Sequence, residues 1–203
     1  TEQDLGQVLR FGAYSEPDVA GLMRSVVLDL AAASAPAHPR TIHVAVDCLL
    51  TSSQERSRVL AIVRRELATT TAPDANWLRL WAHLDPEKAA DWFEHRREQG
   101  GGRAELITTA SLLEQDLNER TGPPVSTALM APSALRRWIR LLFDVFPSSE
   151  DVEHEGAYHP GEHDYGRDFR RRCLSRLAEN PAVEARAVLL ELRADKRLAS
   201  EHD

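Results

Sequence analysis

Apolar side chains recur with a helical period between Ala131 and Pro147, and this segment constrains the fold more than any other. They fall at +3, +4, +7, +8 and +11 from the first, on one helix face: Leu135, Trp138, Ile139, Leu142, Phe143 and Phe146. Three arginines and an aspartate take the opposite side. Pro132 suits the first helical turn and Pro147 ends the segment, so the sequence predicts an amphipathic helix here.

The same pattern returns along most of the chain. We expect further helices over 17–34, 54–67, 74–84, 86–99, 105–120, 165–180 and 182–195. Asp85-Pro86 and Asn180-Pro181 each predict a capping residue followed by proline at the first helical position.

Short helices with short connections predict an all-α fold, either an irregular helical-pair (HEAT-like) array or a compact helical bundle. Within 1–203 we expect one helical domain with a sub-boundary at 121–131 and a long polar loop at 147–166. The chain begins at Thr1 without methionine, so we interpret it as a fragment of a larger protein.

One segment is ambiguous. Residues 41–47 alternate apolar and polar side chains as a strand does, yet they also fit one helix face. Because few other residues offer strand partners, we favour a helix.

Composition narrows the classes of function. A net charge of -7 argues against a nucleic-acid partner. No apolar run approaches the roughly 18 residues of a membrane span, and no secretory signal opens the chain. Cys48 and Cys173 are far apart and lie in apolar context, which favours buried free thiols and a cytoplasmic location.

Motifs for catalysis are missing from the sequence. It contains no GxxxxGK[ST] loop, no GxGxxG cradle and no GxSxG nucleophile elbow. We therefore expect no catalytic residue, no cofactor and no enzyme activity.

A stretch rich in histidine and acid, residues 150–164, is the one candidate metal site. The candidate ligands are the imidazoles of His154, His159 and His163 and the carboxylates of Glu153, Glu155, Glu162 and Asp164. The first two histidines are five positions apart, whereas two ligands on one helix face are four apart. A metal-dependent hydrolase is therefore kept as the alternative function.

Four arginines follow this stretch at the start of the helix expected from residue 165: Arg167, Arg170, Arg171 and Arg172. Positive charge at a helix N-terminus opposes the helix dipole. We expect the acidic stretch to fold back and compensate it, with binding of an external anion as the other interpretation.

Three tryptophans at helical spacing, Trp77, Trp81 and Trp92, have leucines and Phe93 near them. Core packing is the expected role, and an exposed aromatic patch for a partner is the alternative.

From Leu135 to Asp203 the sequence resembles the helical region downstream of the NTPase domain in bacterial NACHT/STAND-type signalling or defence proteins. The most distinctive element is the GAYxPG turn before the arginine helix. The residues that carry the resemblance are Gly156, Ala157, Tyr158, Pro160, Gly161, Asp168, Phe169, Arg170, Leu174, Leu177, Ala178, Pro181, Glu184, Ala185, Leu189, Leu192, Asp195 and Leu198.

The resemblance implies a non-catalytic segment for ligand sensing, autoinhibition or assembly. Its partners would be other proteins or other domains of the same polypeptide. The net charge and the lack of a long apolar run, given above, lead us to expect no nucleic acid and no membrane. We expect contacts through Tyr158, Arg167, Arg170 and Arg171. A self-contained dimerising helical module is the third hypothesis, so an oligomer is left open.

Overall fold

The computed structural model describes residues 29, 56–117, 128–150 and 161–196. Within these residues every regular element is helical, which confirms the predicted all-α class. The expected helix at 17–34, apart from residue 29, and the ambiguous segment 41–47 lie outside the described residues.

Seven α-helices and one 3-10 turn make up the described part of the chain. In order they are α4 (Arg56–Thr69), α5 (Ala75–Leu84), α6 (Pro86–Glu98), α7 (Arg103–Leu117), α8 (Pro132–Val145), the turn η1 (Ser148–Glu150), α9 (Glu162–Glu179) and α10 (Val183–Arg193).

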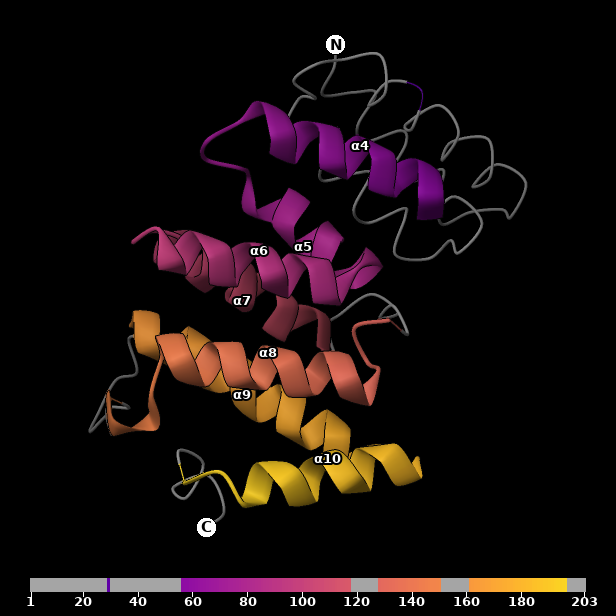
Figure 1. The fold of residues 1–203 in the computed structure, drawn as a ribbon, viewed down its shortest axis with the longest axis vertical. Coiled ribbons are helices and arrows are strands. Elements are labelled where there is room, and N and C mark those ends of the chain that lie inside the picture. The colour runs from indigo at the N-terminus through magenta and orange to yellow at the C-terminus, as the bar shows by residue number, and fades with distance from the viewer. Residues whose placement is uncertain (1–28, 30–55, 118–127, 151–160, 197–203) are drawn as a thin grey trace.

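The helices form two layers (Figure 1). Helices α5, α7 and α9 pack in sequence in one layer, while α6, α8 and α10 pack in sequence in the other. Helices adjacent in the chain contact each other across the layers, as α5 and α6 or α9 and α10 do. Helix α4 lies at one end of the stack and α10 at the opposite end.

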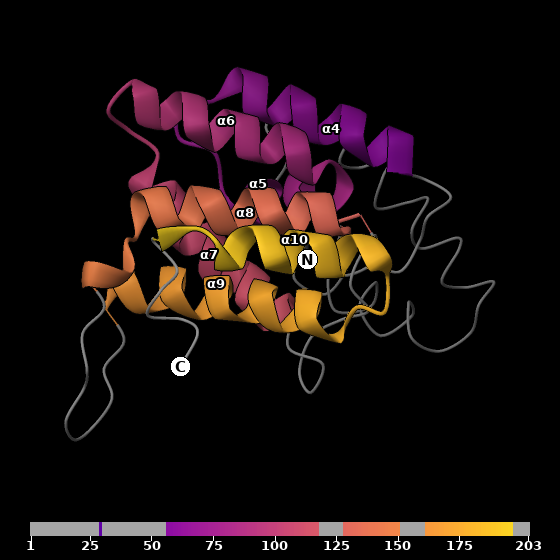
Figure 2. The same cartoon turned by 60° about the horizontal axis from the view of Figure 1, so that its bottom comes forward.

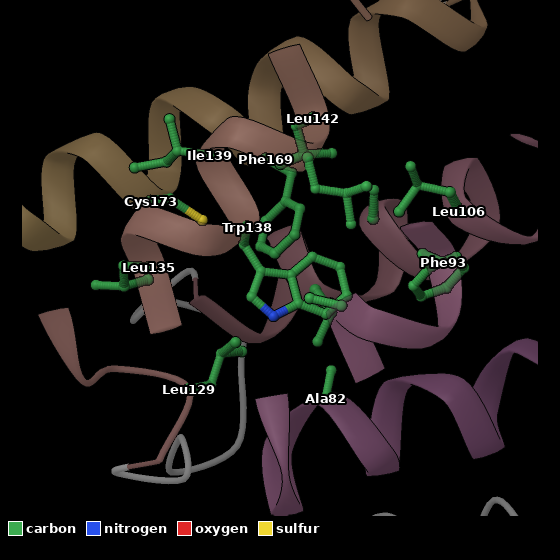
Figure 3. Packing of buried hydrophobic residues seen from close by; sticks show 14 of the residues in the cluster. Ala82, Phe93, Leu106, Leu129, Leu135, Trp138, Ile139, Leu142, Phe169 and Cys173 are labelled. Carbon is green, nitrogen blue, oxygen red and sulfur yellow. The ribbon is translucent and has the colours of Figure 1, made fainter. Parts of the chain in front are cut away.

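Aromatic rings join the layers through the centre of the core (Figure 3). The Trp138 ring lies edge-on to Phe93 and to Phe169, with 5.8 Å between centroids in each case. The buried Trp138 Nε1 donates a hydrogen bond of 3.2 Å to the carbonyl oxygen of Pro86. One cluster of buried side chains runs from Leu78 to Leu192, so residues on both sides of 121–131 share a core.

The tryptophans behave as core residues. Trp77 is buried, and Trp81 and Trp92 are partly buried against the core cluster. Trp92 also stacks edge-on with Phe93, with centroids 5.0 Å apart. The predicted core role is therefore confirmed for Trp77, and the other two occupy its margin.

Asp85 and Pro86 begin α6 as the sequence predicts. The Asp85 side chain accepts a hydrogen bond from the Lys88 backbone N–H, and Pro86 takes the first helical position. Because proline has no N–H to donate, this position removes one of the unpaired donors of a helix start.

The same prediction is wrong for Asn180 and Pro181. Helix α10 begins two residues later, at Val183, with Ala182 before it. The Asn180 side chain instead accepts a 3.0 Å hydrogen bond from the Ala182 N–H, which closes a turn on the chain between the helices.

The predicted polar loop 147–166 is too long at its C-terminal end, because α9 begins at Glu162. The carboxylate of Asp164 accepts a 2.7 Å hydrogen bond from the Gly161 N–H, while the Gly161 carbonyl accepts from the Asp164 N–H. This reciprocal pair stabilises the first turn. The spacing of apolar residues does not depend on such hydrogen bonds, so the sequence pattern does not predict this helix start.

Candidate interaction surface

Arg167, the first of the predicted contact residues, is mostly buried at the start of α9. Its side chain is 13% exposed and forms ion pairs with Asp164 at 2.8 Å and with Asp168 at 3.4 Å. Both carboxylates are on α9 itself, so part of the expected charge compensation comes from within the helix. Residues 151–160 of the acidic stretch lie outside the described part of the chain.

Arg170 lies in the core. Its Nη1 donates a 2.6 Å hydrogen bond to the carbonyl oxygen of Phe146, the residue that caps the C-terminus of α8. Its guanidinium also lies 4.2 Å from the centroid of the Phe143 ring, a cation–π distance. Arg170 therefore ties α9 to α8, and a partner cannot reach it while the two helices stay packed.

Arg171, one position further along, is exposed on α9. Among the predicted contact residues in the described part of the chain, it is the one whose side chain solvent reaches freely. Tyr158 lies outside the described residues.

The candidate metal ligands stay untested. His154 and His159 lie outside the described residues, and the side chain of His163, at the start of α9, is not described either. Within residues 29, 56–117, 128–150 and 161–196, no group of three or more histidine, cysteine or acidic side chains is arranged to hold a metal ion.

A buried ionic cluster that the sequence reasoning missed joins α5 to α7. Asp116 of α7 accepts a 2.6 Å hydrogen bond from Arg79 Nε and lies 2.8 Å from His83 Nε2. A second oxygen of the carboxylate accepts from Arg79 Nη2. His83 and Asp116 are almost fully buried and Arg79 is 8% exposed.

The environment of Asp116 favours its charged form. Burial, the largest influence, raises the pKa of Asp116, but the hydrogen bonds and charges of His83 and Arg79 together hold it below its usual range. A histidine paired with a carboxylate resembles part of a catalytic triad. Here the pair is buried, and its contacts join α5 to α7.

Helix α10 presents an apolar stripe to solvent at the end of the stack. We call it the outer stripe. It consists of Val183, Ala187 and Leu190 of α10 together with Ala194, the residue that caps the helix C-terminus, and all four are exposed. Val183 is 86% and Leu190 60% exposed, and with Tyr165 they are the large hydrophobic side chains that the described residues leave in solvent. The opposite side of α10 packs on α8 and α9 (Figure 2).

Charged residues border the outer stripe in a segregated way. At 100° per residue, Glu184 and Glu191 lie along one edge, the acidic flank, while Arg186 and Arg193 lie along the other, the basic flank. Glu191 is also held by α8, since it forms ion pairs with Arg136 at 3.2 Å and with Arg140. The stripe and its two flanks form the candidate interaction surface.

The exposed side of α6 and α8 is occupied by a different set of charges. Arg137 of α8 reaches across to Glu87, Asp91 and Glu94 of α6, with a distance of 2.8 Å to Glu94. These ion pairs are satisfied within the chain, so this face offers no comparable apolar surface.

No helix among the described residues has the length and apolar character to cross a membrane. Comparison with known proteins finds no match to a family model, to a curated protein or to a solved structure.

Proposed function

We propose that this chain is a non-catalytic helical interaction segment that acts in ligand sensing, autoinhibition or assembly. The observation that supports it best is the outer stripe of α10, where Val183 and Leu190 stand in solvent at the end of a helical stack. Exposed apolar residues that line up on one helix face are typical of a surface that binds another helix.

The buried chemistry agrees with this proposal. Two sets of buried ionisable groups, Arg170 and the cluster around Asp116, bond to other helices of the same chain. Such groups fix helix positions. A surface for binding then has to lie on the outside of the stack, where α10 supplies it.

The proposed context is a larger STAND-type NTPase of bacteria, and it depends on the sequence resemblance between Leu135 and Asp203. It predicts a P-loop motif upstream of Thr1 in the full-length product of the gene. A full-length product with no such motif would remove the context and leave the interaction segment to be judged by itself.

A photo-crosslinking experiment tests the interaction surface. A benzophenone amino acid replaces Leu190 in the full-length protein, and the same group replaces Thr108, an exposed residue of α7, as the control. We expect crosslinks from position 190 to another domain or chain, identified by mass spectrometry, and few from position 108. Equal yields at both positions would contradict the proposal.

Metal analysis separates this proposal from the metal-dependent hydrolase. Elemental analysis of the purified chain, with zinc and manganese titration, is compared with that of His159→Ala. Stoichiometric metal that disappears in the variant would overturn the non-catalytic assignment.

A further inference from the structure

Helix α10 carries apolar residues on two sides, and only one of them is used within the chain. Ala185, Val188 and Leu192 are buried on the side that packs on α8 and α9. The outer stripe occupies the other side. In a heptad numbering that places Leu190 at position d, the outer stripe fills successive d and a positions, the seam of a two-stranded coiled coil.

The charges beside this seam fall into register as well. Glu184 and Glu191 both occupy position e, while Arg186 and Arg193 both occupy position g. In a parallel helix pair, the g residue of one helix faces the e residue of the other. In an antiparallel pair, g faces g and e faces e, which here would oppose arginine to arginine and glutamate to glutamate.

We propose that α10 joins two copies of this chain in a parallel, twofold-symmetric pair. The outer stripes pack against each other, and the basic flank of each copy faces the acidic flank of the other. The inference rests on the proposed function, whose contact surface it assigns to a second copy. Leucine at d is the residue that parallel two-stranded pairs favour at this position.

Contacts within the chain already hold Glu191 where one of the ion pairs between the two copies would form. In heptad register, Arg186 faces Glu191 of the second copy, five positions further along. Within its own chain Glu191 is held by Arg136 and Arg140 of α8, which fixes its carboxylate beside the seam. The Glu191 side chain is still 40% exposed, so a further donor can reach it.

Among the described residues, none packs on the outer side of α10, where the second copy would lie. Helix α10 is at one end of the stack, and its neighbours α8 and α9 pack on its inner side (Figures 1 and 2). A twofold axis parallel to α10 therefore places the two stacks on opposite sides of the seam.

The pair is expected to be weak. Helix α10 has 11 residues, so its seam covers less than two heptads. A contact of this length falls below the about 1,200 Å² of a standard stable interface, and we expect a dissociation constant on the order of 0.1 mM.

Sedimentation equilibrium of the 203-residue chain tests the association. Between about 10 µM and 1 mM, we expect a reversible monomer–dimer equilibrium. Leu190→Glu puts a charge into the seam and should weaken dimerisation by at least about tenfold. Thr108→Glu adds the same charge to exposed α7 and should leave the equilibrium unchanged. A chain that stays monomeric at the highest concentration, or an equal effect of both variants, would overturn the proposal.

Disulfide trapping tests the orientation. In a Cys48→Ser background, Leu190→Cys places identical residues opposite each other only in a parallel pair, so we expect a covalent dimer on mild oxidation. Cys173 is buried and does not compete. Preferential crosslinking in a mixture of Ala187→Cys and Leu190→Cys chains would indicate an antiparallel pair, in which an a residue faces a d residue, and would refute the proposed geometry.

The two proposals fail in different ways. If the isolated chain is monomeric but position 190 of the full-length protein crosslinks to a different domain or protein, the second copy is wrong as the occupant and the interaction function stands. If position 190 crosslinks no better than position 108, both are wrong.

Discussion

Replacing Asp116 with asparagine should destabilise the chain strongly, because it removes the negative charge that pairs with the buried guanidinium of Arg79. Arg79 is 8% exposed and directs Nε and Nη2 at the carboxylate. Breaking a buried ion pair by removing one partner costs about 3–5 kcal/mol. The asparagine oxygen still accepts one hydrogen bond, so we expect a loss of stability near the lower limit, about 3 kcal/mol.

Urea denaturation followed by circular dichroism measures this loss. For a chain of this size with an m-value of about 2 kcal/mol/M, a loss of about 3 kcal/mol lowers the midpoint by about 1.5 M. Asp91→Asn is the matched control, because Asp91 also accepts from an arginine, Arg137, but its side chain is 41% exposed. Exposed ion pairs contribute below about 1 kcal/mol. Equal losses in the two variants would refute the structural role given to the cluster.

The pH dependence of this difference is a second part of the same test. The pKa of Asp116 is lowered in the folded chain, so the carboxylate stabilises the fold fully above its unfolded pKa. That contribution is lost as the pH falls through the folded pKa. The advantage of the native chain over Asp116→Asn should therefore shrink between about pH 5 and pH 2. An advantage that grows on acidification would contradict the assignment of Asp116 as the charged partner.

Three further predictions concern the packing of α9. Gly166→Ala should lower the free energy of unfolding by about 2 kcal/mol in urea denaturation, because a Cβ there overlaps the ring of Phe146. At an open helix position the same change raises stability, so a gain in stability would be evidence against this contact. Arg170→Met should lower the free energy of unfolding by about 2 kcal/mol, because it removes the hydrogen bond to the Phe146 carbonyl. Arg171→Met should lower it much less. The reverse order would contradict the burial of Arg170. Burial raises the pKa of the Cys173 thiol, so a thiol reagent should label Cys173 only at the rate of unfolding; rapid labelling of the folded chain would disprove its enclosure.

Helices with a clean period were predictable from the sequence. The segment from Ala131 to Pro147 predicts α8 to within two residues, because its large apolar side chains all face the core and prolines bound it. Helix α7 was expected from residue 105 and begins at Arg103. The helix starts directly after Gly102, whose φ of 85° is a backbone conformation that glycine adopts readily. The spacing of the apolar residues does not reveal this conformation, so it does not predict where the helix starts.

The burial of charged residues was not predictable in the same way. Arg170 was expected to contact a partner, yet it packs inside between α8 and α9. Asp116 is 37 positions from Arg79, and a pairing at that separation leaves no local pattern. The one available signal was the spacing of Arg79 and His83. They are four residues apart, and so on one face, in a helix whose other residues apart from Asn76 are apolar.

The helices that pack against α10 determine which of its apolar residues are buried in the core. Both sides of the helix carry apolar residues, so the sequence alone gives no preference between Leu192, which is buried, and Leu190, which is exposed. The contacts with α8 and α9 make that choice. The candidate surface therefore becomes visible only when the neighbours of α10 are known.

The end position of α10 makes its outer side the part of the described structure most suited to binding. A helix that closes a stack against water has a polar outer face. Helix α10 instead exposes Val183 and Leu190, and segregates glutamate to one flank and arginine to the other. Apolar burial would supply the attraction to a partner helix, while the flanks would decide its direction, because like charges oppose one another in the antiparallel arrangement. The outer side of α10 thus combines an apolar stripe with a charge pattern that would restrict its partners, as the proposed interaction segment requires.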